Sequence, residues 1–190
     1  MKTRLLIAVS GSVLALGACN KSSQVTTNAT DTNMAMDNGM APNGMAEAAP
    51  LTAQGFANTA AASDRFEIES SRLAAASASS AAVKSFADKM ISAHSASTAK
   101  LKSTLAGMSP ALTPDDTLAA EQQSTLDGLK GKTGADFDTA YAAAQVDAHQ
   151  KALDALKGYS ASGDNAALKS FADGLIPTVT AHLNMAKGLK

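Results

Sequence analysis

Cysteine, tryptophan and strand-like patterns are scarce or missing in this chain. Its one cysteine is Cys19, and it has no tryptophan. Because a single thiol has no partner for a disulfide within the chain, the fold depends on packing alone. No stretch of alternating apolar and polar residues is long enough to predict a strand. The sequence therefore excludes an internal disulfide and argues against a sheet.

Charge of one sign and catalytic motifs are also lacking. The 16 lysines and arginines are balanced by 17 aspartates and glutamates, and the basic residues form no cluster. Nucleic acid is therefore not expected as a partner, because its phosphates require concentrated positive charge. Gly-Lys-Thr at 131–133 lacks the upstream glycine and the strand of a phosphate-binding loop. An enzyme is not favoured by these patterns.

The first 18 residues resemble a bacterial lipoprotein signal peptide. Lys2 and Arg4 precede an apolar run at 5–16, which is too short to cross a bilayer as a mature helix. The run leads into Leu-Gly-Ala-Cys, which is similar to the lipobox, the motif in which the cysteine is lipidated. The sequence therefore predicts lipidation of Cys19; the alternative is an ordinary secretory signal with a chance cysteine.

Lipidation implies a location in the cell envelope. Several acyl chains together hold a protein firmly on a membrane. Asn20 follows the cysteine where Asp would stand in some lipoproteins, and by resemblance to Gram-negative lipoproteins this favours the outer membrane. We expect the chain to be lipid-anchored there, facing the periplasm or the cell surface.

Residues 19–50 form a low-complexity segment rich in Asn, Thr, Ala and Met. Such a composition cannot bury enough apolar surface to offset the entropy of ordering, so it predicts a disordered tether. Four methionines lie here, and thioethers are ligands for soft ions such as Cu(I). The weak candidate ligands are Met34, Met36, Met40 and Met45. The alternative is sequence drift without any binding role.

Residues 51–190 are predicted to form an all-α domain. Alanine is abundant there, and prolines are few. The expected helices cover 52–78, 80–107, 113–129, 135–159 and 166–189, with Thr113 as the cap of the short third helix. A short helix inside a long central connection is typical of a ferritin-like four-helix bundle.

A five-residue repeat indicates two related helical hairpins. Lys-Ser-Phe-Ala-Asp occurs at 84–88 and again at 169–173, and each copy is followed by a histidine. The first helices of the two hairpins also align, 66–74 with 146–154. Repetition of a core-forming unit explains most of this similarity.

The three histidines of the chain all fall on apolar helix faces. These are His94, His149 and His182, each on a different predicted helix. Glu69 is the acidic residue that the pattern places on the remaining inward face, three after Phe66. We expect these four side chains to converge on one point, where they could hold a single Zn, Cu or Fe ion. The alternative is a hydrogen-bonded polar cluster without metal.

A di-iron oxidase is not expected. Its sites require Glu-x-x-His on two helices. No glutamate of this chain has a histidine three positions later.

Four segments in order resemble the bacterial family known as domain of unknown function 4142. They are FEIESSRLA (66–74), VKSFADKMISAH (83–94), GADFDTAYAAAQVDAHQKAL (134–153) and LKSFADGLIPTVTAHLNMAK (168–187). The resemblance implies a ferritin-like, exported protein and no established activity. Members often carry Asp immediately before the histidine that matches His94, whereas this chain has Ala93.

Two functions follow as hypotheses. The favoured one is a non-enzymatic envelope lipoprotein whose bundle binds a protein partner, forms a homodimer or serves the envelope under stress. The alternative is a metal-binding protein that uses the inward Glu and His cluster.

Overall fold

A computed structural model describes residues 52–189, and this part of the chain is all-α, as predicted. Within these residues, no helix is long and apolar enough to cross a membrane. The predicted signal peptide, tether and Cys19 lie outside the described residues. The five helices are α1 (Ala53–Ser77), α2 (Ala81–Ala106), α3 (Ala120–Lys130), α4 (Gly134–Ser162) and α5 (Ala166–Lys187).

Capping side chains set the starts of α1 and α5. The Thr52 hydroxyl accepts a hydrogen bond from the backbone N–H of Gly55 at the start of α1. The Asn165 side chain accepts from the N–H groups of Ala167 and Leu168 at the start of α5. Such caps satisfy N–H groups that have no partner inside the helix.

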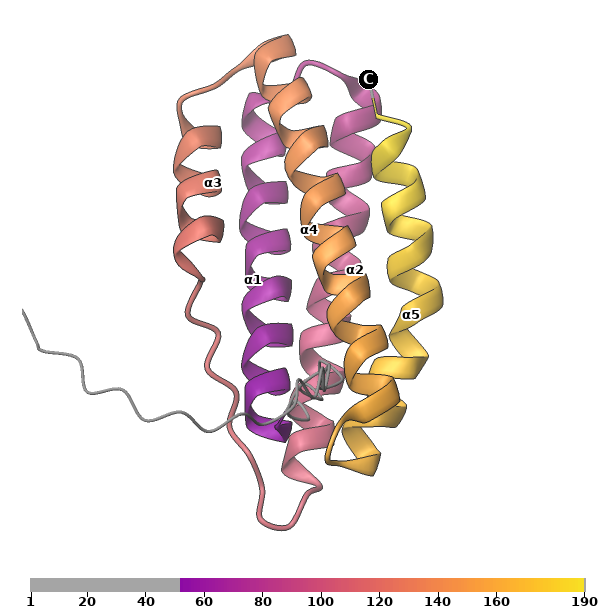
Figure 1. Cartoon of the computed structure of the whole chain (residues 1–190). Helices are drawn as coiled ribbons and strands as arrows, with labels where there is room; N and C mark the ends of the chain where they lie inside the picture. Colours follow the sequence, from indigo (N-terminus) through magenta and orange to yellow (C-terminus); the bar gives the residue numbers. More distant parts are fainter. Residues whose placement is uncertain (1–51, 190) are drawn as a thin grey trace, which may run out of the picture. The chain divides into compact units, whose positions relative to one another are not determined.

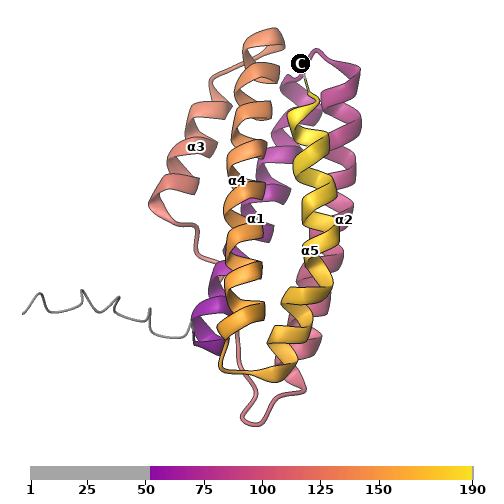
Figure 2. The same cartoon turned by 45° about the vertical axis from the view of Figure 1, so that its right-hand side comes forward.

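The helices α1, α2, α4 and α5 form the bundle, and the short helix α3 lies outside it (Figure 1). The chain makes two hairpins, α1–α2 and α4–α5, and α1 packs against α4 while α2 packs against α5. Figures 1 and 2 show that α2 and α4 run in the same direction, because the crossover that contains α3 returns the chain along the bundle. This is the predicted ferritin-like arrangement.

The crossover helix begins later than predicted. Residues 113–119 are extended, and α3 starts only at Ala120. The Gln54 side chain donates to the carbonyl of Thr113, and the Asn58 side chain accepts from the N–H of Asp115. Because α1 takes up these backbone groups, the segment runs along α1 instead of coiling, and Thr113 is not a helix cap.

The buried core has two apolar clusters, and along α1, α2 and α4 a polar layer separates them. The first, the Tyr159 cluster, includes Phe56, Leu101, Leu105, Leu156 and Phe171. The second, the Tyr141 cluster, includes Val83, Phe86, Met90 and Phe137. The polar layer consists of Asp64, Glu67, Ser70, Ser71, His94, Gln145, His149 and His182, all buried.

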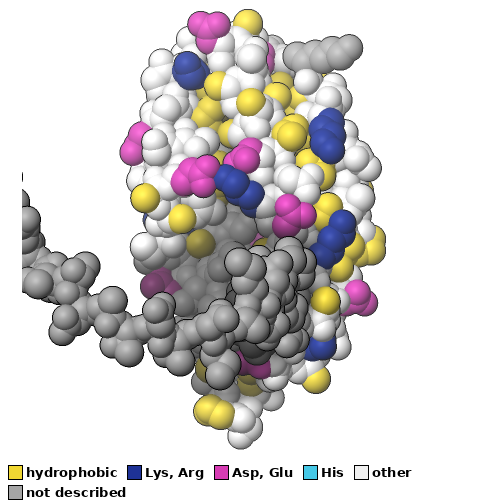
Figure 3. All heavy atoms as spheres, in the orientation of Figure 1, with side chains coloured by type: hydrophobic (Ala, Val, Ile, Leu, Met, Phe, Trp, Pro, Cys, Tyr) yellow, Lys and Arg dark blue, Asp and Glu magenta, His cyan; other side chains and the backbone are white. Residues whose placement is uncertain are grey.

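Charged side chains lie on the outside. Figure 3 shows Lys and Arg interspersed with Asp and Glu on the face that it presents, where no histidine is visible. The histidines are absent from this view because all three are buried.

Candidate metal centre

Three imidazole rings meet in the polar layer. His94 comes from α2, His149 from α4 and His182 from α5, and their side chains are buried. The ring centroids are 5.6 Å (94–149), 5.8 Å (94–182) and 5.5 Å (149–182) apart. One ring nitrogen from each lies within 4.8 Å of the other two. The structure therefore brings together all three histidines that the sequence singled out.

Hydrogen bonds on the outer side of two rings set their orientation. The Nδ1 atom of His94 lies 2.8 Å from a carboxylate oxygen of Asp64, which also accepts a hydrogen bond from Thr98. The Nδ1 atom of His149 lies 2.8 Å from the backbone carbonyl of Gln145, to which it donates. The Nε2 atoms of these rings are therefore the ones left to bind something else.

Three buried ring nitrogens have no hydrogen-bond partner in the described structure. They are Nε2 of His94, Nε2 of His149 and Nδ1 of His182. A buried polar atom without a partner costs about 1–3 kcal/mol. A metal ion would engage one nitrogen from each ring, so three converging imidazoles that each have an unpartnered nitrogen fit a metal ion.

Burial keeps two of the imidazoles neutral. It lowers the pKa of His149 to about 4, and it lowers the pKa of His182 to about 4 as well. For His94, burial also acts to lower the pKa, but the hydrogen bond to Asp64 and the charge of Glu67 outweigh it and raise the pKa above its ordinary value. Neutral imidazole is the form that binds metal, and His149 and His182 hold it at neutral pH.

Glu67 is the buried carboxyl group closest to His149. The residue is 1% exposed, neither carboxyl oxygen has a hydrogen-bond partner, and burial raises its pKa to about 7. One oxygen lies 3.5 Å from Nδ1 of His149, on the side of the ring that faces Gln145. In the described residues, the group of side chains close enough to share an ion contains the three histidines and neither carboxylate.

The prediction for Glu69 is wrong. Glu69 lies outside the polar layer, its side chain is 38% exposed, and it forms an ion pair with Arg65 at 2.8 Å. The sequence placed the inward face of this helix on Phe66, but Phe66 lines a groove with residues of α3 such as Gln122. Because α3 covers a second face of α1, α1 has two buried faces, and the face toward the histidines carries Asp64 and Glu67.

A sequence signal for these two missed residues does exist. Ala57, Ala61, Asp64, Ser71 and Ala74 recur at helical spacing and are all buried. Small and polar residues make this stripe less conspicuous than the one through Phe66, although it is the stripe that faces the bundle interior.

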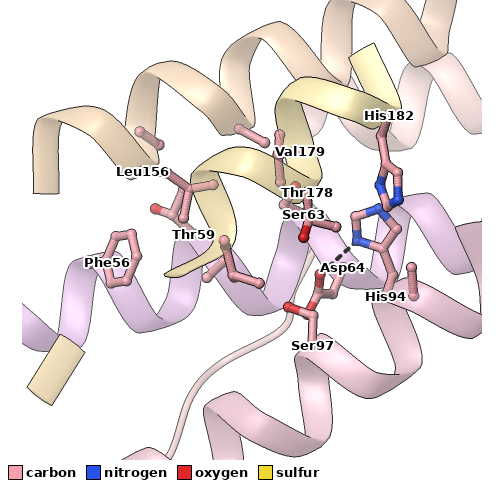
Figure 4. A pocket seen from close by; sticks show the side chains of 15 residues that line it. Phe56, Thr59, Ser63, Asp64, His94, Ser97, Leu156, Thr178, Val179 and His182 are labelled. Carbon is pink, nitrogen blue, oxygen red and sulfur yellow. Dashed lines mark hydrogen bonds and ion pairs between the residues drawn. The ribbon is translucent and has the colours of Figure 1, made fainter. Parts of the chain in front are cut away.

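A cavity of about 60 Å³ leads up to the histidines. Figure 4 shows Phe56 and Leu156 at one end and the rings of His94 and His182 at the other, with Asp64 hydrogen-bonded to His94. Apolar side chains such as Val179 and Leu175 supply much of its wall, and the hydroxyl groups of Ser63, Ser97 and Thr178 also line it. One side of the imidazole cluster therefore borders open space.

Comparison with known proteins supports the fold and the family. No curated protein sequence matches the chain. A solved structure titled "CopM in the Cu(II)-bound form" is similar to it with a TM-score of 0.62 and 16% sequence identity, over 73% of this chain and 95% of that one. At this identity the likeness concerns the fold alone. The family described as "Domain of unknown function (DUF4142)" matches residues 38–189, so the chain belongs to that family.

Proposed function

We propose that the bundle binds one transition-metal ion through His94, His149 and His182. The observation that carries the proposal is the convergence of three buried ring nitrogens, within 4.8 Å of one another, in a layer where three ring nitrogens have no hydrogen-bond partner. A purely structural polar cluster would pair these nitrogens with one another or with nearby side chains.

Copper and zinc suit this donor set best. Imidazole binds Zn, Cu, Fe and Ni, and among divalent first-row ions the affinity of a given site is highest for copper. The similar solved structure is described as Cu(II)-bound, which makes copper the first ion to test.

The two carboxylates act behind the imidazoles. Asp64 holds the ring of His94 and supports its basicity, as outer carboxylates do for metal-binding histidines. Glu67 is a buried acid beside His149, and its ionised form would offset part of the charge of a bound cation.

The role favoured from the sequence, binding of a protein partner, receives little support from the surface. In residues 52–189, Met185 is the one large apolar side chain that is exposed. Apolar patches are the usual sign of a docking face. Partner binding and homodimer formation therefore remain weaker proposals than metal binding.

The experiment compares metal binding by the chain from residue 20 onward with that of a His149→Ala, His182→Ala double variant. We expect one equivalent of Cu(II) or Zn(II) in the parent protein and a melting temperature that rises with metal, because a ligand that binds only the folded state stabilises it. The double variant should bind no metal at this site. Metal content by mass spectrometry and thermal unfolding measure both effects.

The matched control is Gln150→Ala with Lys187→Ala, which changes exposed residues on the same two helices. It should keep both the metal and the melting shift. A parent protein that binds no metal, or a double variant that binds it equally well, would overturn the proposal.

We further propose that Cys19 anchors the protein to the outer membrane. The support is the sequence of residues 1–20, which lies outside the described residues. Mass spectrometry of protein purified from membranes should find acyl chains on Cys19, and a Cys19→Ser variant should lose them and leave the membrane fraction. An unmodified Cys19 in membrane-extracted protein would contradict this.

A further inference from the structure

The three imidazoles leave part of the coordination sphere of a bound ion open. In the described residues, no aspartate, glutamate or cysteine joins the histidines in the group that could share an ion. Sites with three protein ligands keep a position for water or substrate, whereas structural sites are closed by four protein ligands. Asp64 also lines the cavity, but its carboxylate already forms hydrogen bonds with His94 and Thr98.

The open side of the cluster borders the cavity. His94 and His182 line it, and so do Thr59 of α1 and Thr178 of α5, which are exposed at the surface. Surface residues and two of the three rings therefore line the same cavity (Figure 4). Its volume of about 60 Å³ exceeds the ~10–15 Å³ that a single water requires.

We propose that this cavity admits a small exogenous ligand, of the size of azide or dioxygen, to the metal at the position that the imidazoles leave open. This inference rests on the proposed metal site. The largely apolar wall favours a compact neutral or singly charged molecule over a large hydrated one, because a polar group moved there without a partner is penalised. The metal site then serves to bind a small molecule and not to store the ion alone.

The test uses the chain from residue 20 onward, loaded with one equivalent of Cu(II), and sodium azide as the probe. Azide that coordinates Cu(II) produces a charge-transfer absorption band and changes the electron paramagnetic resonance spectrum. We expect both changes in the parent protein, with copper still bound after azide is removed.

Two substitutions fill the cavity from different helices without replacing a histidine. Ser97→Leu acts from α2 and Ala155→Leu from α4, and both residues line the cavity. We expect azide affinity to fall at least about tenfold in each, with Cu(II) affinity unchanged. If one variant loses copper because its packing is disturbed, the other carries the test. Ala96→Leu, an exposed residue of α2, is the matched control and should bind azide normally.

The outcomes separate the two proposals. Copper binding with no spectral response to azide, or with equal azide affinity in the filled variants, overturns the cavity proposal and leaves the metal site standing. Removal of copper by azide also overturns it, because the ligand would then compete with the protein instead of joining the site. A parent protein that binds no copper or zinc defeats the metal site, and the cavity proposal with it.

Discussion

The two hairpins of the bundle share the Lys-Ser-Phe-Ala-Asp segment but supply different chemistry to its centre. The α1–α2 hairpin contributes one imidazole, His94, together with both carboxylates of the polar layer, Asp64 and Glu67. The α4–α5 hairpin contributes two imidazoles, His149 and His182, whose pKa values burial lowers to about 4. One hairpin therefore provides the negative charge, and the other provides most of the neutral ligands.

The repeated segment builds the core and not the site. Phe86 belongs to the Tyr141 cluster, whereas Phe171 belongs to the Tyr159 cluster. The distance from this phenylalanine to the following histidine is three residues longer in α5, and Pro177 lies within that stretch. Three residues add about 4.5 Å of helix rise. The departure from the repeat, together with the pairing of hairpins, places His94 and His182 side by side.

The largest effect on stability is expected when the buried carboxyl group of Glu67, in the α1–α2 hairpin, is replaced by an amide. In the folded protein, burial raises the pKa of Glu67 to about 7 from its ordinary value of 4.5. The folded state binds more protons in this window, so this group makes stability fall as pH rises through it. In the absence of metal, the unfolding free energy of Glu67→Gln relative to that of the parent protein should therefore increase by about 3 kcal/mol as the pH rises from about 4 to about 8.

Urea unfolding of both proteins in the presence of a chelator measures this difference. Using the difference between the two proteins removes the opposite trend from His149 and His182, whose lowered pKa values make stability fall as pH drops from about 6.5 to about 4. Unfolding free energies that differ by a constant amount across the range would show that Glu67 has an ordinary pKa.

Removing the other charge of the same hairpin tests the metal site. Asp64→Asn keeps the shape of the side chain but loses the negative charge next to His94. We expect Cu(II) or Zn(II) affinity to fall about 10–100-fold, the usual cost of losing an outer partner of a metal-binding histidine. Competition with a chelator of known affinity measures it, and an unchanged affinity would assign Asp64 a structural role alone.

The smallest effect is expected for Glu69, which lies two residues from Glu67 but outside the polar layer. Its ion pair with Arg65 is partly exposed, and such pairs contribute about 0–1 kcal/mol. Glu69→Gln should leave metal affinity and the pH profile of stability unchanged. A loss of metal binding in this variant would reverse the assignment of the two glutamates.

Much of the fold could be predicted because helix periodicity is a local property. The bounds of α1, α2 and α5 follow from apolar spacing and capping residues, and the inward direction of the histidines follows from their positions relative to Met90, Leu153 and Val179. The start of α3 could not be predicted, since it depends on α1 side chains that lie more than fifty residues earlier.

The sequence pattern also could not identify which acidic residue of α1 lies beside the histidines. Glu67 and Glu69 are both acids on one helix, and the stripe through Phe66 favours Glu69. Only the docking of α3 against α1 explains why Phe66 is buried away from the histidines.

The sequence by itself determined an all-helical chain with a histidine on the inner face of three helices, because the 3.6-residue period assigns each residue to a face. The tertiary structure alone decided that these histidines meet in one layer, that one ring nitrogen from each lies within 4.8 Å of the other two, and that Asp64 and Glu67 contact the Nδ1 atoms of His94 and His149. The physical reason is that the layer is assembled from four separate helices. Its geometry depends on how the hairpins pack, which no local pattern records.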